Sequence, residues 1–213
     1  MTVPSPTAVD GSRLSAKQLA RRQRVIEVAL LLGAEGGYEA VHMREVADRS
    51  QVSLGTIYRY FGSKDHLLVA GLSEWTAQLQ TRLARRPARG DAPVDQLVDV
   101  LRRASRALEQ QPNLTAALIK ALGSADPLVA AAAVNVRGQI SAMAEPILAE
   151  LAPEEIEEIV GVLRHVWYSA MMIWASGRSG ISAIGDDLER ATRLLLAAHP
   201  ALCLSSARTA AGS

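Results

Sequence analysis

MREVADRSQVSLGTIYRYFGSKDHLL (residues 43–68) contains two short amphipathic segments joined by a tight corner, followed by the start of a longer helix. Val46 and Ala47 supply the inward side of the first segment. Val52 lies at the corner, and Ile57 supplies the apolar wedge of the second segment. This spacing predicts a helix-turn-helix whose second helix is short enough to enter the major groove of DNA.

The polar and small residues of the same stretch are the candidate DNA contacts. Hydroxyls and cations at helix starts bind phosphate, whereas an arginine or an exposed glycine near the groove allows base edges to be read. The phosphate candidates are Thr56, Tyr58, Tyr60 and Lys64, the base-reading candidates are Leu54, Gly55 and Arg59, and Arg44 and the expected N-cap Ser53 complete the set. Tyr60 is equally well explained as a core residue. Arg59 could instead be a solvated surface residue. Tyr58 and Lys64 have no evident packing role.

The composition favours an all-α protein. Apolar residues make up 49% of the 213 residues, aromatic residues only 4%, and β-branched runs are few. The net charge of +1 averages unlike parts, because residues 1–65 hold nine Lys/Arg against seven Asp/Glu. The basic side chains before Ile26, which suit a phosphate backbone or a solvated helix face, are Arg13, Lys17, Arg21, Arg22 and Arg24.

Helical periodicity continues along the chain and divides it into two domains. We expect a tail over residues 1–13, a helix-turn-helix domain over 14–62, a helical ligand-binding and dimerisation domain over 63–199, and a tail over 200–213. A helix from about Ser15 should stop at Gly36–Gly37, and one from Lys64, with Ser63 as its expected N-cap, should join the two domains. The later helices are expected at 93–110, 112–122, 126–151 (broken at Pro146), 153–176 and 186–198.

Several classes of function find no support in the sequence. Cys203 is the only cysteine, so neither a disulfide framework nor a cysteine metal site is expected. We assign His42 and His66 to the polar surface, and we expect no metal and no cofactor. Catalytic motifs and long apolar runs are also missing, so we expect a cytoplasmic protein that is not an enzyme.

The residues GGYEAVHMREVADRSQVSLGTIYRYFGSKDHLL (36–68) resemble the DNA-binding domain of the TetR family of transcriptional regulators. T-I-Y-R-Y-F-x-S-K (56–64) carries the strongest match, and the departures are Gly33, where a large aromatic is common, and Gln51, where glycine is usual. If the corner needs a positive φ, Gln51 carries a cost in backbone strain of about 1 kcal/mol. The resemblance implies an all-α homodimer that binds a palindromic operator and is released by a ligand. The strings GGYEAV-MR-VADR and V-GT-YRYF-SK-HLLV, together with a late W-x-x-x-x-x-x-W helix, make the chain most similar to KstR-type repressors of steroid degradation. This similarity implies a steroid-derived or acyl-CoA thioester effector.

The segment VGVLRHVWYSAMMIWASG (160–177) is apolar nearly all round and should be buried on more than one side. For each residue in it, plain core is the competing reading. The candidate ligand contacts are Leu118, Leu122, Met143, Trp167, Tyr168, Met171, Met172 and Trp174. The candidate cations for the phosphates of coenzyme A are Arg102, Arg103, Arg106 and Lys120. The alternative for each is a solvated charge on a helix face.

The last helix, around Leu188 and Leu195, should pair with residues 156–175 to form a dimer interface, or pack within one subunit. A helical DNA-binding protein without a small-molecule effector is the alternative to the regulator.

Overall fold

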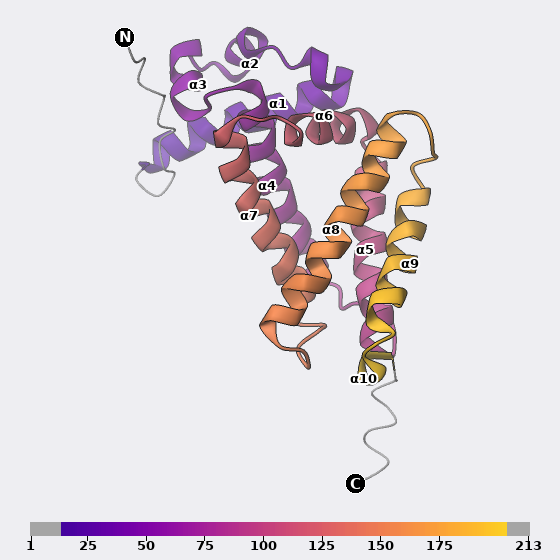
Figure 1. Ribbon diagram of the computed structural model, residues 1–213. Coiled ribbons are helices and arrows are strands. Elements are labelled where there is room, and N and C mark those ends of the chain that lie inside the picture. The colour runs from indigo at the N-terminus through magenta and orange to yellow at the C-terminus, as the bar shows by residue number, and fades with distance from the viewer. Residues whose placement is uncertain (1–13, 204–213) are drawn as a thin grey trace. The chain divides into compact units, whose positions relative to one another are not determined.

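The computed structural model describes residues 14–203, and every regular element in that range is a helix, which confirms the all-α prediction (Figure 1). The helices are α1 (Ala16–Ala40), α2 (Met43–Ser50), α3 (Leu54–Tyr60), α4 (Lys64–Ala84), α5 (Pro93–Glu109), α6 (Pro112–Leu122), α7 (Pro127–Ala144), α8 (Pro153–Ala175), α9 (Ala183–Leu196) and α10 (Pro200–Cys203). The two predicted tails lie outside this range, except that Pro200–Cys203 form α10.

Local sequence signals explain where the helices begin and end. Ser15 caps α1 in a reciprocal capping box with Gln18. Gly37 has φ 71°, a left-handed conformation that glycine adopts without strain, so the regular helix stops where the sequence predicted. α5 and α8 each begin with a proline, and α7 ends at Ala144, before Pro146.

The helices group into two compact units. One unit comprises residues 14–75 and 111–136, and the other comprises residues 76–110 and 137–203. The predicted helix-turn-helix segment therefore shares a unit with α6 and the first half of α7. Helices α4 and α7 each contribute residues to both units.

In the first unit, α1 packs on α2, α3 and α6. Its core is built from aliphatic side chains and one phenylalanine, all fully or almost fully buried: Val25, Ile26, Ala29, Val41, Val46, Ile57, Phe61, Leu67 and Leu68. Gly33 is buried, and a Cβ there would lie 3.0 Å from Leu114 of α6. The aromatic side chain that is common at this position would therefore collide with α6.

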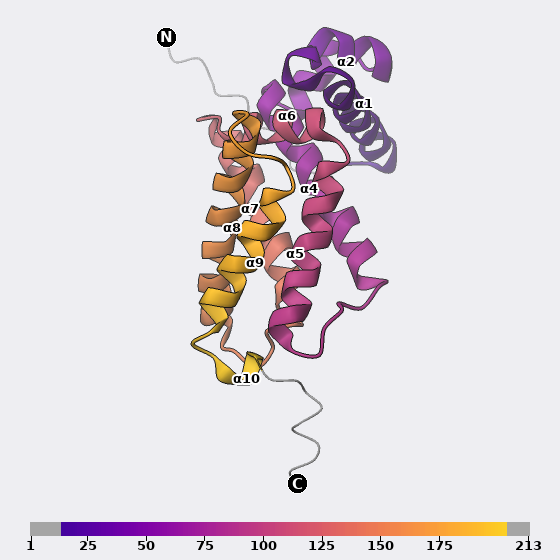
Figure 2. The same cartoon turned by 90° about the vertical axis from the view of Figure 1, so that its right-hand side faces the viewer.

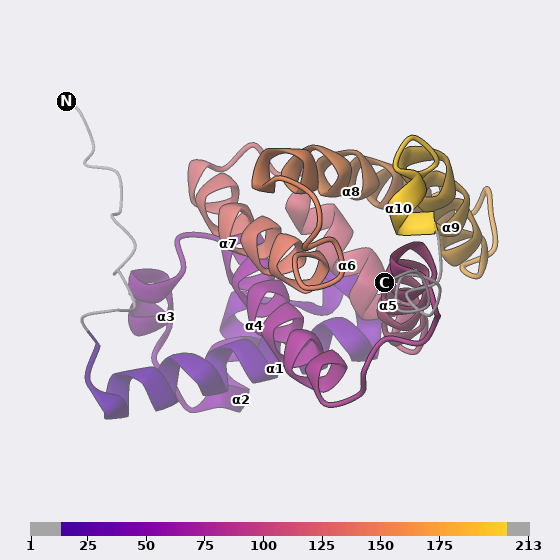
Figure 3. The same ribbon diagram turned by 90° about the horizontal axis from the view of Figure 1, so that it is seen from below.

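In the second unit, α9 lies against both α5 and α8 (Figure 2). Apolar side chains at helical spacing fill the space between them, including Leu97, Leu101, Leu163, Ile184, Leu188 and Leu196. α10 follows α9 and contacts α5 and α9, as seen from below in Figure 3. Among residues 14–203, no single helix is both long and apolar enough to cross a membrane, although α6 and α7 meet that test as a bent pair.

Candidate DNA-binding surface and ligand cavity

The corner between α2 and α3 has the geometry of a helix-turn-helix. Gln51 closes α2 in the left-handed region (φ 55°, ψ 40°) and has the only positive φ outside glycine among the described residues. Its side-chain amide donates to the carbonyl of Asp48 at 2.7 Å. Val52 and Ile57 are buried on either side of the start of α3. The corner thus forms with a strained backbone, which the sequence predicted for Gln51.

The outward face of α3 carries several of the predicted DNA contacts. Tyr58 is 46% exposed, and Arg59 is also exposed. A Cβ on Gly55 would meet nothing within 4 Å, so the backbone there is open to a ligand. Arg44, at the start of α2, is exposed as well, and Leu54 is partly exposed. These residues lie on one corner and are accessible together.

Ser53 and Thr56 also serve the fold. The Ser53 hydroxyl accepts the backbone N–H of Thr56 at 3.4 Å and lies 2.9 Å from the Thr56 hydroxyl. This is the N-cap that the sequence predicted for α3. One hydroxyl hydrogen of this pair is free to turn towards a phosphate, because the two hydroxyls share a single hydrogen bond.

Tyr60 is buried, with 3% of its surface exposed, so its ring belongs to the core. Its ring contacts Phe61 edge to face, and the Arg59 guanidinium lies 5.9 Å from its centre. Its buried hydroxyl has no hydrogen-bond partner among the described residues. A buried hydroxyl without a partner is costly. A phosphate oxygen could accept from it only after neighbouring side chains moved to expose it.

Lys64 has a packing role that the sequence did not reveal. Its ammonium lies 3.8 Å from the centre of the Tyr38 ring and donates to the Tyr38 carbonyl at 3.1 Å. Lys120 of α6 lies 4.3 Å from the same ring, and the Tyr38 hydroxyl donates to Asp65 at 2.5 Å. Burial, together with the Asp65 carboxylate, raises the pKa of Tyr38 to about 12. Lys64 therefore belongs to a cluster that joins α1, α4 and α6.

Two other basic or titratable residues have structural partners. Arg22 pairs with Glu74 at 2.9 Å and lies 5.1 Å from the centre of the Phe61 ring. His66, predicted on the polar surface, is only partly exposed, and its Nδ1 accepts the N–H of Gly62 at 3.3 Å. Burial lowers the pKa of His66. Within residues 14–203, no cluster of three His, Cys, Asp or Glu side chains could hold a metal ion.

A small cavity lies in the second unit between α5, α7 and α8. Its volume is about 20 Å³, and it is lined by Leu97, Val100, Leu101, Ala104, Ile140, Met143, Ala144, Val160, Leu163, Arg164 and Trp167. Met143 and Trp167 are the two predicted ligand contacts in this lining. Arg164 is the polar residue that the sequence analysis missed. Arg164 lies three residues before Trp167, so both side chains lie on one side of α8. This spacing is the sequence signal that could have identified Arg164 as a cavity residue.

The other predicted ligand contacts lie elsewhere. Leu118 and Leu122 belong to α6 in the first unit, where Leu118 is a core residue. Met171 and Trp174 are partly exposed, and neither lines the cavity. Tyr168 and Met172 are exposed by 38% and 43%. Periodicity alone did not separate these positions, because α8 is apolar on several sides.

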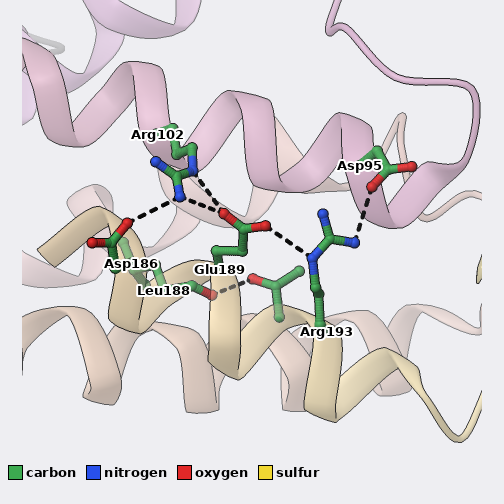
Figure 4. Close-up of polar contacts among 7 residues, drawn as sticks. Asp95, Arg102, Asp186, Leu188, Glu189 and Arg193 are labelled. Atoms are coloured by element: carbon green, nitrogen blue, oxygen red, sulfur yellow. Dashed lines mark hydrogen bonds and ion pairs between the residues drawn. The ribbon is translucent and has the colours of Figure 1, made fainter. Parts of the chain in front are cut away.

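The cations proposed for coenzyme A phosphates are mostly engaged within the chain. Arg102 of α5 lies between Asp186 and Glu189 of α9, and Arg193 joins Glu189 to Asp95 (Figure 4). Hydrogen bonds from the two arginines hold the pKa of Glu189 below its usual value. This network fastens α9 to α5.

Arg103 and Lys120 are held in the same way, whereas Arg106 is exposed. Arg103 pairs with Asp99 and donates to the carbonyls of Arg86 and Pro87. Lys120 pairs with Glu39 at 2.6 Å. None of these four cations lines the cavity.

α8 and α9 leave apolar side chains exposed. The exposed fraction is 45% for Val162, 37% for Ile173 and 72% for Leu194, in addition to Tyr168 and Met172. On α9, the buried face is formed by Leu188, Thr192 and Leu196. The same helix thus packs inside its own subunit on one face and presents Leu194 outward on another.

Comparison with known proteins matches both parts of the chain. Residues 25–70 match the model for bacterial regulatory proteins of the tetR family, and residues 90–195 match the model for the tetracyclin repressor-like C-terminal domain. The HTH-type transcriptional repressor KstR of Mycobacterium tuberculosis is 34% identical over 183 residues, which cover 85% of this chain and 83% of the relative. KstR of Rhodococcus jostii is 34% identical over 196 residues, which cover 92% of each protein.

Solved structures agree with the sequence relatives. A TetR transcriptional regulator from a Rhodococcus species has a TM-score of 0.77 at 31% identity, over 84% of this chain and 97% of that one. Thermus thermophilus FadR, a TetR family repressor solved with lauroyl-CoA, has a TM-score of 0.68 at 25% identity, over 82% of this chain and 93% of that one. The chain therefore belongs to the TetR family of transcriptional regulators and is similar to the KstR repressors.

Proposed function

We propose that this regulator represses transcription from a palindromic operator and leaves it when a large apolar effector binds. The observation that carries the proposal is the α2–α3 corner, which exposes Tyr58, Arg59 and the Gly55 backbone on one short helix. The KstR relatives are repressors, which supports the same sign of regulation. A DNA-binding regulator of this kind works by binding rather than by catalysis, and in the cytoplasm.

The proposed DNA contacts divide by chemistry. Arg59 addresses a base edge, with Leu54 and the Gly55 backbone close to the groove. Tyr58, Thr56 and Lys64 contact phosphates, together with Arg44 and the hydroxyls of Ser53 and Tyr60. Lys64 donates to the Tyr38 carbonyl, and because an ammonium has three donors, it can keep this bond and still donate to a phosphate.

The effector is proposed to bind in the cavity between α5, α7 and α8. Its closed volume of about 20 Å³ admits roughly one water molecule, whereas ligand pockets measure roughly 300–1,000 Å³. Ligand binding must therefore separate these helices. α7 contributes to both compact units, so a shift of α7 provides a route to the DNA-binding helices. The lauroyl-CoA bound to Thermus thermophilus FadR supports an acyl-CoA thioester as the effector class.

The regulator is proposed to act as a homodimer through α8 and α9. The exposed side chains of Val162, Met172 and Leu194 support this interface, since a second copy would bury them. Two recognition helices related by a twofold axis then require an operator with two related half-sites.

The experiment has two stages. The purified full-length chain selects DNA fragments from a random pool, and sequencing of the bound fragments should reveal a palindrome. Candidate acyl-CoA and steroid compounds are then added to the complex with that palindrome. Release at micromolar effector concentration would support the proposal, whereas a lack of any enriched sequence would rule out operator recognition.

A DNA-binding protein without a small-molecule effector is the second candidate. The small volume of the cavity favours this second candidate, because a protein that binds no effector does not need a larger cavity. The two candidates differ in thermal stability with ligand present. An effector raises the melting temperature of a regulator by mass action, but leaves that of an effector-free protein unchanged.

A further inference from the structure

Trp167 has a buried hydrogen-bond donor with no partner among the described residues. The residue is 7% exposed, and the Nε1 atom of its indole ring is buried. Indole N–H groups in protein interiors normally find an acceptor, because an unpaired donor loses the hydrogen bond that it makes to water in the unfolded chain. Because Trp167 also lines the cavity, its unpaired N–H is a candidate contact for a ligand that enters there.

The rest of the cavity offers this donor little. Apart from Arg164 and Trp167, the lining consists of aliphatic side chains and the thioether of Met143. Such side chains favour an apolar ligand body and supply no strong acceptor for the indole N–H.

Arg164, in contrast, already has partners. Its two terminal nitrogens donate to Glu157 at 3.2 and 3.1 Å, and its side chain is 18% exposed. Ser141 donates to the other oxygen of the same carboxylate at 2.7 Å. The hydrogen bond from Ser141, reinforced by Arg164, keeps the pKa of Glu157 below its usual value. An anionic ligand would have to displace this carboxylate to reach the guanidinium.

We infer that the effector presents a neutral oxygen acceptor, such as a ketone, ester or thioester carbonyl, to Trp167 Nε1 from an otherwise apolar body. This rests on the proposed function, in which the cavity is the effector site. A plain hydrocarbon would leave the indole N–H unpaired. An ionised carboxylate would lose its hydration among aliphatic side chains, with the nearby cation already neutralised by Glu157.

The test compares three probes of matched shape that differ in one group. These are 2-acetylnaphthalene with a ketone, 2-ethylnaphthalene with a hydrocarbon group, and 2-naphthoate with a carboxylate. Their affinities for the full-length wild-type chain are measured by titration. We expect the ketone to bind about tenfold more tightly than the hydrocarbon, as one well-placed hydrogen bond allows, and more tightly than the carboxylate.

The Trp167→Phe variant removes the donor and keeps an aromatic ring. It should lose the preference for the ketone over the hydrocarbon, while Trp174→Phe, in the same helix but outside the lining, should keep it. A nuclear magnetic resonance measurement can be made on the wild-type chain, so it does not depend on the folding of a variant. The chain has three tryptophans, and the ketone should shift the indole N–H resonance of Trp167 downfield.

Four outcomes would overturn the inference. They are equal binding of ketone and hydrocarbon, tightest binding of the carboxylate, an unshifted Trp167 resonance and no detectable binding of the ketone. Failure of the proposed function would look different. In that case the ketone preference and its dependence on Trp167 would hold, but no bound compound would release DNA.

Discussion

The hydroxyl of Ser63 joins the starts of two helices, because it donates to the Asp126 carboxylate at 2.6 Å and accepts the N–H of His66 at 3.1 Å. Ser63 thereby caps α4, as the sequence predicted. Asp126 in turn accepts the N–H of Leu128 at 2.8 Å and caps α7. The two helices that contribute to both compact units are thus tied together at their N-termini, within the DNA-binding unit.

Replacing Ser63 should destabilise this unit. Ser63→Ala removes the cap of α4 and the partner of Asp126, so we expect the free energy of unfolding to fall by about 1–2 kcal/mol. Ser63→Thr retains the hydroxyl and should cost about 0.5 kcal/mol or less. Urea unfolding followed by circular dichroism measures both. Equal stability of the wild type and Ser63→Ala would show that the cap contributes nothing.

The Ser63–Asp126 hydrogen bond also predicts that the stability of the protein depends on pH in the acidic range. The Ser63 hydroxyl, followed by the Leu128 N–H, lowers the pKa of Asp126 in the folded chain. The stabilisation from Asp126 is therefore complete above the unfolded pKa of about 3.9, and is lost as the pH falls through the lower folded pKa. Asp126→Asn should remove this part of the dependence. Urea unfolding between pH 2.5 and 6 would reveal it as a flatter profile in the variant.

Gln51 offers a measurement of backbone strain. Gln51→Ala and Gln51→Gly both lose the bond from the side-chain amide to the Asp48 carbonyl. They differ in the left-handed backbone, which alanine tolerates poorly and glycine tolerates well. We expect the glycine variant to unfold with a free energy about 1 kcal/mol higher than the alanine variant. A more stable alanine variant would mean that the chain relaxes out of the left-handed conformation.

The sequence predicted features that depend on neighbouring residues. The stop at Gly37, the strained corner at Gln51 and the caps at Ser53 and Ser63 are all local signals, and the structure has each of them. It did not predict the partner of Lys64. Tyr38 lies 26 residues earlier in the chain, and only the packing of the helices brings the two together.

Ligand contacts were predicted less well for a related reason. An apolar residue on α8 can face a cavity, the core or a partner subunit, and the helical period does not distinguish these three surroundings. Met143 and Trp167 line the cavity, whereas Met172 and Tyr168 point outward. Arg164 was missed although two local signals were present, its spacing of three residues from Trp167 and of seven residues from its carboxylate partner Glu157 in the same helix.

Variants of the proposed DNA contacts should lose either affinity for all DNA or preference for the operator. Tyr58→Ala and Lys64→Ala should weaken binding to every DNA sequence and reduce the salt dependence by about one phosphate contact per subunit. Arg59→Ala should instead reduce the preference for the operator by about tenfold or more, since a good arginine–guanine pair discriminates by about 1–3 kcal/mol. Mobility-shift titrations at several salt concentrations, with operator and unrelated DNA, measure both.

Two further variants make these losses interpretable. Lys120→Ala removes the second ammonium from the Tyr38 ring and is the control for the packing role of Lys64. Tyr60→Phe deletes a buried hydroxyl that has no partner among the described residues, so it should leave stability unchanged or raised while weakening DNA binding. Unchanged DNA affinity in Tyr58→Ala, Lys64→Ala and Arg59→Ala would exclude this mode of docking.

The proposed dimer interface can be tested with one exposed apolar residue on each of its two helices, α8 and α9. Met172→Glu on α8 and Leu194→Glu on α9 place a carboxylate where the partner's apolar surface would bury it, at 43% and 72% exposure in the single subunit. Because a buried unpaired charge is costly, each variant should sediment as a monomer at micromolar concentration. Loss of the dimer should also lower operator affinity by at least tenfold, since two recognition helices no longer bind as one unit.

Val134→Glu is the matched control, because Val134 is 52% exposed on α7 but lies on neither α8 nor α9. It carries the same change of charge and should remain dimeric. Thermal melts of all three variants establish whether the subunit itself stays folded. If Leu194→Glu and Met172→Glu sediment like Val134→Glu, the exposed residues of α8 and α9 do not form the interface. The dimer would then have to use another surface, and the spacing of the operator half-sites would no longer be set by these two helices.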